Sequence, residues 1–421
     1  MRVGLLGFGT VGSSFAEVLA AGRHNEVQIT RVFNRDVERK RAQERAKFVP
    51  AEAVWTDRAE DVLTAADVDA VVELIGGLDP VEGWLRTAIT AGKHVITANK
   101  QLLAFRGTEL LDLAAKHCVQ LLFGASVAGG VPVIPGMVQG LSGDDIGRIS
   151  GIVNGTCNFI LSSMETGSNY GEVLANAQRA GYAEADPSAD VDGLDARAKL
   201  CILAGLALHA EIRPEDVPAQ TIRHVGAVDF AYAKELGCTI RQVSRAQFDG
   251  DLVRARVGPM LVPKTSPIAW SRGMQNMIVA SGRFGGDVVF SGHGAGGHPT
   301  AVAAVSDVLA IAHGSSAVQL PVRKIAVTGD VIAPHYLRLV VADRPGIIAA
   351  IAGALAKEQI NIDCVLQHRG HASDRLPFVV TTEPCPRSTL DRAVAAMASM
   401  EFMLEAPLVL EILVEEDRET D

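Results

Sequence analysis

The first 130 residues alternate continuous apolar runs with helical stretches, and this alternation constrains the fold more than any other feature. Each run is rich in Val, Ile and Leu without regular polar positions, which is typical of parallel strands that helices bury on both faces. We therefore predict a doubly wound α/β domain. The expected strands cover residues 2–7, 27–33, 68–76, 94–99 and 119–126.

The first expected strand leads into a turn with glycine at positions 7, 9 and 12. In this context the first glycine makes a tight turn, the second leaves room for a pyrophosphate, and the third lets the helix pack closely against the strand. The N-terminus of the helix attracts the anion. We therefore predict a dinucleotide site. Its expected residues are Gly7, Phe8, Gly9, Thr10, Val11 and Gly12.

The residues after the second strand bear on which dinucleotide binds. Arg35, with Arg39 and Lys40 behind it, is placed to meet a 2′-phosphate, which favours NADP. Asp36 could instead reach a ribose hydroxyl, so NAD stays open.

Lys199 and Lys100 are candidate catalytic residues. Asp195 and Lys199 stand four residues apart on an expected helix that is otherwise almost entirely apolar, so they share one face. Burial disfavours the charged form of an ammonium group, which makes Lys199 a candidate general acid; the alternative is a surface ion pair. Lys100 follows a strand at the sheet edge where ligands bind, although a solvated loop lysine would look the same.

Composition excludes several classes of protein. The 49 acidic and 39 basic residues give a net charge of −10, so the chain offers no cationic surface to nucleic acid or anionic lipid. Its longest apolar stretch, residues 200–208, is about half a membrane span, and its beginning does not resemble a secretory leader. Six cysteines without a CxxC pair predict a reduced cytoplasm and no zinc site.

The chain divides into three expected domains. Residues 1–130 and about 290–320 form the nucleotide domain, because a glycine-rich turn and an apolar helix return to it. Residues 131–290 form a second, α+β domain, for which the family resemblance described below implies catalysis and dimerisation. Residues 321–334 form a linker in which residues 322–330 could add a strand. Residues 335–421 follow a βαββαβ order, which is typical of a ferredoxin-like unit.

Several motifs closely resemble homoserine dehydrogenase over the first 320 residues. The region from residue 335 resembles an ACT domain, a regulatory amino-acid-binding module. Without a kinase domain before the dehydrogenase segments, the chain resembles the monofunctional members of the family. The segments that carry the resemblance are the glycine turn, ELIGG at 73–77, ANK at 98–100, NGTCNFIL at 154–161, the acidic segment 181–200 and GHGAGGHPTA at 292–301.

The resemblance implies reversible, NAD(P)-dependent reduction of L-aspartate 4-semialdehyde to L-homoserine, on the route to threonine and methionine. It implies that Lys199 donates the proton, that Asp195 helps to place the substrate and that Glu184 meets the substrate ammonium. Lys100 would lie at the nicotinamide end, and Gly296 would contact the cofactor.

The resemblance also implies a sodium site, from which this chain departs. The family often has Glu where Gly124 stands, while Val127, Gly129 and Val131 still offer carbonyls. In the ACT-like region, Gly346 and Asn361 are the expected ligands of an amino-acid effector such as threonine, and a turn glycine with a capping asparagine is the alternative.

We further expect a homo-oligomer, either a dimer or a tetramer. Two other functions stay open at this point: another ACT-tailed NAD(P)-dependent amino-acid dehydrogenase, and a non-catalytic amino-acid sensor.

Overall fold

The computed structural model describes all residues except 23, 316–322, 369–373 and 415–421, so parts of the expected nucleotide domain, linker and ACT-like domain lie outside the described residues. The chain forms two compact units, each built from separate segments. The first unit contains Met1–Val153, Ala198–Glu215 and Met274–Ala326; the second contains Asn154–Arg197, Asp216–Gly273 and Val327–Asp421. Within the described residues, no helix is long and apolar enough to span a membrane.

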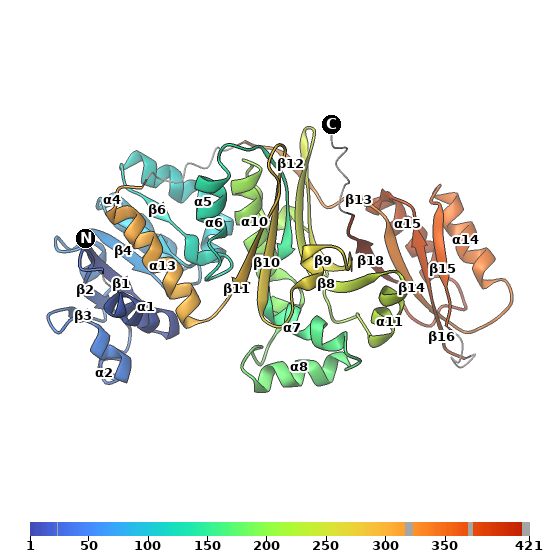
Figure 1. The fold of residues 1–421 in the computed structure, drawn as a ribbon, viewed down its shortest axis with the longest axis horizontal. Coiled ribbons are helices and arrows are strands. Elements are labelled where there is room, and N and C mark those ends of the chain that lie inside the picture. Colours follow the sequence, from blue (N-terminus) through green and yellow to red (C-terminus); the bar gives the residue numbers. More distant parts are fainter. Residues whose placement is uncertain (23, 316–322, 369–373, 415–421) are drawn as a thin grey trace. The chain divides into compact units, whose positions relative to one another are not determined.

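The first unit is built around a parallel sheet of six strands in the order β3-β2-β1-β4-β5-β6 (Figure 1). The order reverses at β1, as in a doubly wound sheet, and the predicted fold class is confirmed. The three-residue strand β3 was not expected, because so short a run carries little pattern. The strands are β1 (Arg2–Leu6), β2 (Gln28–Phe33), β3 (Val54–Thr56), β4 (Ala70–Glu73), β5 (His94–Thr97) and β6 (Leu121–Leu122).

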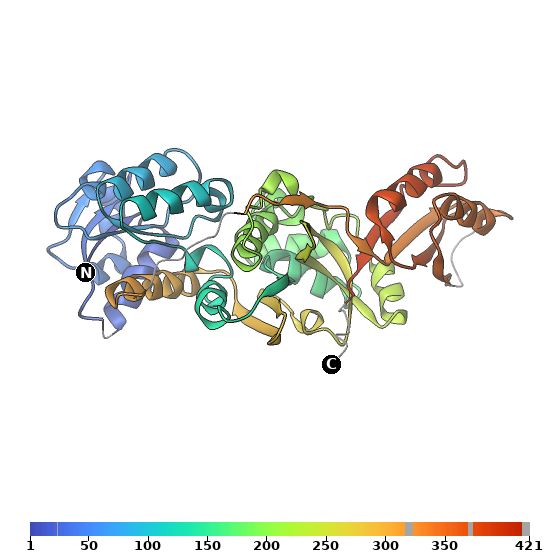
Figure 2. The ribbon, with the colours of Figure 1, turned by 90° about the horizontal axis from the view of Figure 1, so that it is seen from above.

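Helices cover both faces of this sheet. On one face, α1 (Thr10–Ala21) lies beside α13 (Gly297–Ala312), and their apolar side chains share a core with β1, β2 and β4. Figure 2 shows α4 (Val81–Thr90) and α5 (Lys100–Lys116) on the opposite side of the sheet from α13. Shorter helices connect the strands: α2 (Val37–Arg41), η1 (Glu44–Phe48) and α3 (Glu60–Leu63).

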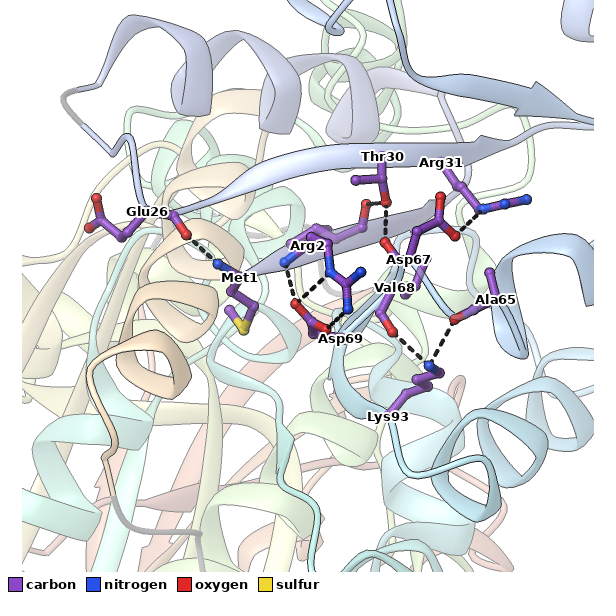
Figure 3. A network of polar contacts seen from close by, with 11 residues as sticks. Met1, Arg2, Glu26, Thr30, Arg31, Ala65, Asp67, Val68, Asp69 and Lys93 are labelled. Atoms are coloured by element: carbon purple, nitrogen blue, oxygen red, sulfur yellow. Dashed lines mark hydrogen bonds and ion pairs between the residues drawn. The ribbon is translucent and has the colours of Figure 1, made fainter.

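A network of polar contacts lies at the edge of the sheet where the strands begin (Figure 3). Arg2 donates from Nη2 to Asp69 Oδ1 at 2.6 Å, and Arg31 donates from Nε to Asp67 Oδ1 at 2.7 Å. Lys93 Nζ donates to two backbone carbonyls of the turn before β4, at 2.8 and 2.7 Å. These contacts pair Arg2, Arg31 and Lys93 at this edge, whereas ligands of such sheets bind at the other edge, where the strands end.

The first unit also contains antiparallel strands. The strand β10 (Gln275–Gly282) pairs with β7 (Ile146–Ile152) on one side and with β11 (Gly286–His293) on the other. The helix α10 (Leu194–Ala207) spans the division between the units. The connection from β6 to β7 contains η2 (Gly124–Ser126), α6 (Val133–Pro135) and η3 (Gly136–Gly140).

The second unit contains a sheet with the order β8-β9-β18-β14-β16-β15. Its first two strands, β8 (Cys238–Asp249) and β9 (Leu252–Pro263), form a long hairpin. Helices α7 (Gly155–Met164), α8 (Tyr170–Arg179) and α11 (Ala227–Glu235) pack with it around a shared apolar core. The remaining short elements are α9 (Ser188–Val191), η4 (Pro214–Asp216), α12 (Pro267–Trp270), β12 (Ala326–Thr328) and β13 (Ile332–Ala333).

The predicted βαββαβ order is confirmed in the C-terminal part of the second unit. Its sheet runs β18-β14-β16-β15, and α14 and α15 pack together over one face (Figure 1). One edge strand, β18, pairs in parallel with β9 through Glu411 and Ile412. The elements are β14 (His335–Val341), α14 (Ile347–Lys357), β15 (Ile362–Leu366), β16 (Leu376–Thr382), β17 (Cys385–Pro386), α15 (Arg387–Ala398) and β18 (Leu408–Ile412).

Candidate active site

The glycine-rich turn between β1 and α1 has the geometry that a dinucleotide requires. Gly7 has φ +99°, a left-handed conformation that favours glycine. A Cβ on Gly12 would lie 2.0 Å from the Gly7 carbonyl oxygen, whereas a Cβ on Gly9 would meet nothing within 4 Å. The turn therefore packs the helix tightly on the strand while leaving open space above Gly9, beside Thr10 and Val11 at the start of α1. Phe8 is fully buried and belongs to the core below the turn.

A network that sequence reasoning did not assign joins the carboxyl ends of β4 and β5. Glu73 is completely buried, and its carboxylate accepts hydrogen bonds from the backbone of Ile75 at 2.7 Å and from Thr97 Oγ1 at 2.5 Å. Asn99 caps α5 by accepting from the Leu102 amide at 3.1 Å. These contacts set the position of Lys100, the first residue of α5, at the ligand-binding edge of the sheet.

Arg35 lies exposed in the loop after β2. Its neighbour Asp36 caps α2, accepting from the Arg39 amide at 3.2 Å, and pairs with the Arg39 guanidinium at 2.6 Å. The carboxylate that was the alternative ribose ligand is therefore engaged by Arg39.

Lys199 is 9% exposed on α10, which agrees with the expectation that its ammonium is desolvated. Its Nζ donates to the carbonyl oxygen of Val153 at 2.9 Å. Val153 follows β7 directly, so the lysine is held at the end of a strand of the first unit. Its burial distinguishes Lys199 from a solvated surface lysine.

Asp195 lies one turn earlier on the same helix and is oriented by an asparagine that sequence reasoning did not single out. Asn154 is 4% exposed, and its Nδ2 donates to Asp195 Oδ2 at 2.9 Å and to Asp190 Oδ1 at 2.7 Å. The Asn154 side-chain oxygen accepts from the Cys157 amide at 2.9 Å and so caps α7. An asparagine just before an expected helix is a capping signal, but it does not reveal the two carboxylates.

Glu184 lies in the second unit, exposed in the loop between α8 and α9. Gln178 Nε2 donates to its backbone carbonyl oxygen at 3.1 Å, which ties the loop back to α8.

The loop of the expected sodium ligands packs against the glycine-rich segment before α13. The amide of Gly130 donates to the His293 carbonyl at 3.1 Å, and Gly296, with φ +121°, precedes the helix. Gly124 donates from its amide to Asp307 Oδ2 at 2.8 Å, and a Cβ there would lie 2.8 Å from Asp307 Oδ1. The Asp307 carboxyl thus lies against the position where the family often has glutamate.

The two expected effector residues stand at opposite ends of α14. Gly346 precedes the helix and borders a cavity of about 320 Å³ with Arg344, Gln367 and Phe378. Asn361 follows the helix, is exposed, and donates from Nδ2 to Glu383 Oε2 at 2.9 Å. The structure therefore does not bring Gly346 and Asn361 together within one chain.

A parallel-sheet nucleotide domain with this glycine turn, joined to a helix that carries a buried lysine, defines a nicotinamide-nucleotide-dependent dehydrogenase. Comparison with family models narrows this class. Residues 7–124 match the NAD binding domain of homoserine dehydrogenase, residues 132–309 match homoserine dehydrogenase, and residues 335–401 match the ACT domain.

Known proteins agree with these matches. A homoserine dehydrogenase of Synechocystis is 36% identical, with 98% of this chain and 99% of the relative covered. A crystal structure of a homoserine dehydrogenase from Thiobacillus denitrificans has a TM-score of 0.91 and 32% identity, covering 98% of both chains. A hyperthermophilic archaeal homoserine dehydrogenase in complex with NADPH has a TM-score of 0.65 and 25% identity, covering 76% of this chain and 99% of that one.

This chain belongs to the homoserine dehydrogenase family and is an oxidoreductase with an NAD(P)-binding Rossmann-like domain, a catalytic domain and an ACT domain. The resemblance on which the expectations rested is confirmed.

Proposed function

We propose that this chain reversibly reduces L-aspartate 4-semialdehyde to L-homoserine with a nicotinamide dinucleotide. The observation that carries the proposal is the buried ammonium of Lys199, held 2.9 Å from the Val153 carbonyl oxygen in a member of this family. A desolvated cation stabilises developing negative charge far better than a solvated one does.

Each candidate residue has a role in this reaction. A nicotinamide dinucleotide, when bound, would supply a hydride to the aldehyde carbon. Lys199 stabilises the negative charge that develops on the aldehyde oxygen and donates the proton. Asp195, oriented by Asn154, and Glu184 hold the substrate, with Glu184 meeting its ammonium, while Lys100 contacts cofactor or substrate at the nicotinamide end.

The test is an absorbance assay at 340 nm with purified full-length protein, homoserine and either NADP or NAD, at alkaline pH, where release of the proton favours oxidation. We expect homoserine-dependent reduction of the cofactor. No reduction of either cofactor would contradict the proposal, and equal rates with serine would indicate a different substrate.

NADP is the proposed cofactor, with NAD as a weaker substitute. Two features support this preference: the exposed guanidinium of Arg35, and the pairing of Asp36 with Arg39, which competes with the bond that a carboxylate would make to an NAD ribose.

Replacing Arg35 with alanine should raise the KM for NADP by about tenfold or more and leave the KM for NAD nearly unchanged, because only NADP carries the extra phosphate. Steady-state kinetics with both cofactors measure this. Arg41→Ala, which removes another guanidinium from the neighbouring helix α2, is the matched control and should leave both values unchanged. An equal effect of Arg35→Ala on the two cofactors would refute the assignment.

We also propose a sodium site, without the glutamate that the family often has. The carbonyls of Val127, Gly129 and Val131 are the proposed ligands, although the Val131 carbonyl already accepts from the Val133 amide at 2.8 Å. Gly124 adds no carboxylate, so the loop offers backbone oxygens and the neighbouring Asp307 carboxyl. Assays that exchange sodium for potassium at constant ionic strength measure the contribution of the ion.

The division into nucleotide, catalytic and ACT domains with the expected boundaries also stays a proposal, as does a cytoplasmic location, which the six free cysteines support. We also propose a homo-oligomer, a dimer or tetramer. Because β18 already pairs with β9, the edge strand β15 is the edge of the ACT sheet that would meet a second copy.

The ACT domain is proposed to bind an amino-acid effector, with threonine as the first candidate. The start of α14 at Gly346 would hold the carboxylate beside the cavity of about 320 Å³. Because Asn361 lies at the other end of the helix, its contribution would come from another subunit.

Threonine should inhibit the full-length enzyme, and Gly346→Ala should weaken this inhibition by about tenfold, because φ +93° strains any residue with a side chain. Initial rates against threonine concentration measure the effect. Gly353→Ala is the matched control: it lies inside the same helix, and an added Cβ there meets nothing within 4 Å. Inhibition that survives Gly346→Ala unchanged would place the effector elsewhere, and no inhibition of the wild type would exclude threonine.

A further inference from the structure

A second cavity, of about 300 Å³, lies within the second unit between the β8–β9 hairpin and the C-terminal strands. One wall is apolar and comes from residues 331–334 with Pro384 and Val414. The other wall is formed by charged side chains of the hairpin and of β18. These side chains include Arg245, Arg254, Arg256 and Glu411.

The hairpin register concentrates positive charge on one face. Arg245 of β8 stands directly opposite Arg256 of β9, and Gln247 stands opposite Arg254. Residues two apart on a strand share a face, so the three guanidinium groups border the same cavity. Like charges directly opposite each other destabilise a sheet, so this arrangement calls for a compensating anion.

Among the described residues, carboxylates form ion pairs with two of these three arginines. Glu411, 3% exposed, lies 3.4 Å from Arg245 Nη1, and the partly exposed Asp249 lies 2.7 Å from Arg254 Nε. Arg256 remains: it is 9% exposed, and among the described residues its only hydrogen bond runs from Nη2 to Gln220 Oε1 at 3.4 Å.

Arg387 acts electrostatically on Arg256 and is itself paired with Asp391, whose Oδ1 lies 2.7 Å from Arg387 Nε. Arg387 presents a buried Nη1 without a hydrogen-bond partner among the described residues. Burial, and after it Arg387, lowers the pKa of Arg256 to about 10, although Glu411 and Asp391 oppose the shift; Arg256 stays charged at neutral pH. Burial and the same arginines lower the pKa of His335 to about 4. A buried guanidinium that forms no ion pair with a described carboxylate is costly to the folded state, and a bound anion would lower this cost.

We propose that this cavity binds a small metabolite carrying a carboxylate or phosphate group, with Arg256 making the central contact and Arg245 and Arg254 flanking it. A guanidinium matches either oxyanion with two parallel hydrogen bonds, and the apolar wall accommodates a short carbon body. The cavity is lined by β9 on one side and by β18 and the segment before β17 on the other. A ligand bound in this cavity would therefore contact both the β8–β9 hairpin and the strands of the ACT region.

The test measures thermal unfolding of the full-length protein with inorganic phosphate or succinate, at an ionic strength held constant with sodium chloride. At about ten times the dissociation constant, at least one of the two anions should raise the unfolding midpoint by about 2–4 °C, and the rise should saturate. A response to phosphate alone identifies a phosphate ligand, and a response to succinate alone identifies a carboxylate.

Variants assign the effect to this cavity. Arg256→Met should abolish the rise in unfolding midpoint that anion binding in this cavity causes. Without added anion, this variant should unfold at a higher temperature than the wild type, because a buried charge without an ion-pair partner is removed. Arg392→Met, an exposed arginine of α15 paired with Glu358 at 2.7 Å, should keep the full rise. Arg256→Lys keeps the charge but loses the two-pronged geometry, and calorimetry should show binding at least about tenfold weaker.

Three results would overturn the proposal. The first is the absence of a saturable rise with either anion, or an equal rise with sodium chloride. The second is a rise that persists in Arg256→Met. The third is a lower midpoint of Arg256→Met without anion, which would make Arg256 a structural residue. If Arg256→Met does not fold, Arg256→Lys decides: unchanged anion affinity overturns the proposal, and weakened affinity supports it.

Discussion

Replacing Lys199 with alanine should lower the turnover of homoserine oxidation by about a hundredfold to ten-thousandfold, the usual contribution of a positioned acid or base. The lysine is 9% exposed and is held at the end of β7 by the Val153 carbonyl, so its ammonium is preorganised as well as desolvated. Because both effects act on the charge that develops in the transition state, the loss should appear in kcat more than in KM.

Steady-state kinetics in both directions measure this, and circular dichroism checks that the variant is folded. Lys116→Ala, an exposed lysine at the end of α5, is the control and should have wild-type activity. Asp195→Asn should chiefly raise the KM for homoserine, because that carboxylate is proposed to place the substrate. A loss below about threefold in Lys199→Ala would leave Lys199 a structural residue.

The second large effect is expected in stability. Burial raises the pKa of Asp307 from 3.8 to about 7, although the Gly124 and Ala125 amides oppose the rise. The folded state therefore binds the proton more tightly than the unfolded state does. Stability from this group is fully present below about pH 3.8 and is lost as the pH rises toward 7.

The neutral variant Asp307→Asn should lack this pH dependence. A shift of about three pKa units corresponds to about 4 kcal/mol, and since Asp307 retains some solvent contact we expect about 2–4 kcal/mol. The free energy of unfolding of Asp307→Asn minus that of the wild type should rise by this amount between pH 4 and pH 7 and then level off, by about pH 8.

Urea unfolding at five pH values from about 4.5 to 8.5 measures the difference. Asp112→Asn, at an exposed position of α5, controls for the loss of one negative charge. Parallel pH profiles of Asp307→Asn and the wild type would contradict the prediction. The Asp307 carboxyl also accepts a hydrogen bond from the Gly124 amide, and it lies so close that it limits which side chain could replace Gly124.

Much of the architecture could be read from local pattern. The buried apolar runs identified five strands of the parallel sheet, and the order of helices and strands after residue 335 matches β14 to β18 closely. Glycine was informative for the same reason: Gly7 and Gly12 occupy positions where a side chain meets strain or backbone within the same short segment. Such signals are encoded within about a dozen neighbouring residues.

Parts of the candidate site could not be read in this way. Lys199 and Asp195 were recognisable from an apolar helix and a family motif, but their partners Val153 and Asn154 lie more than forty positions earlier in the chain. The Glu73 to Thr97 contact likewise joins the ends of two different strands.

The sequence by itself determined the class of fold, the glycine turn and the charged helix, because each depends on residues close together in the chain. Only the tertiary structure decided which polar groups are paired. Asp307 lies against Gly124, and Arg245 reaches Glu411 across 166 positions, while the Arg256 guanidinium opposite Arg245 donates to Gln220. Strand register and helix packing set these distances, and both depend on contacts between remote segments that no local pattern records.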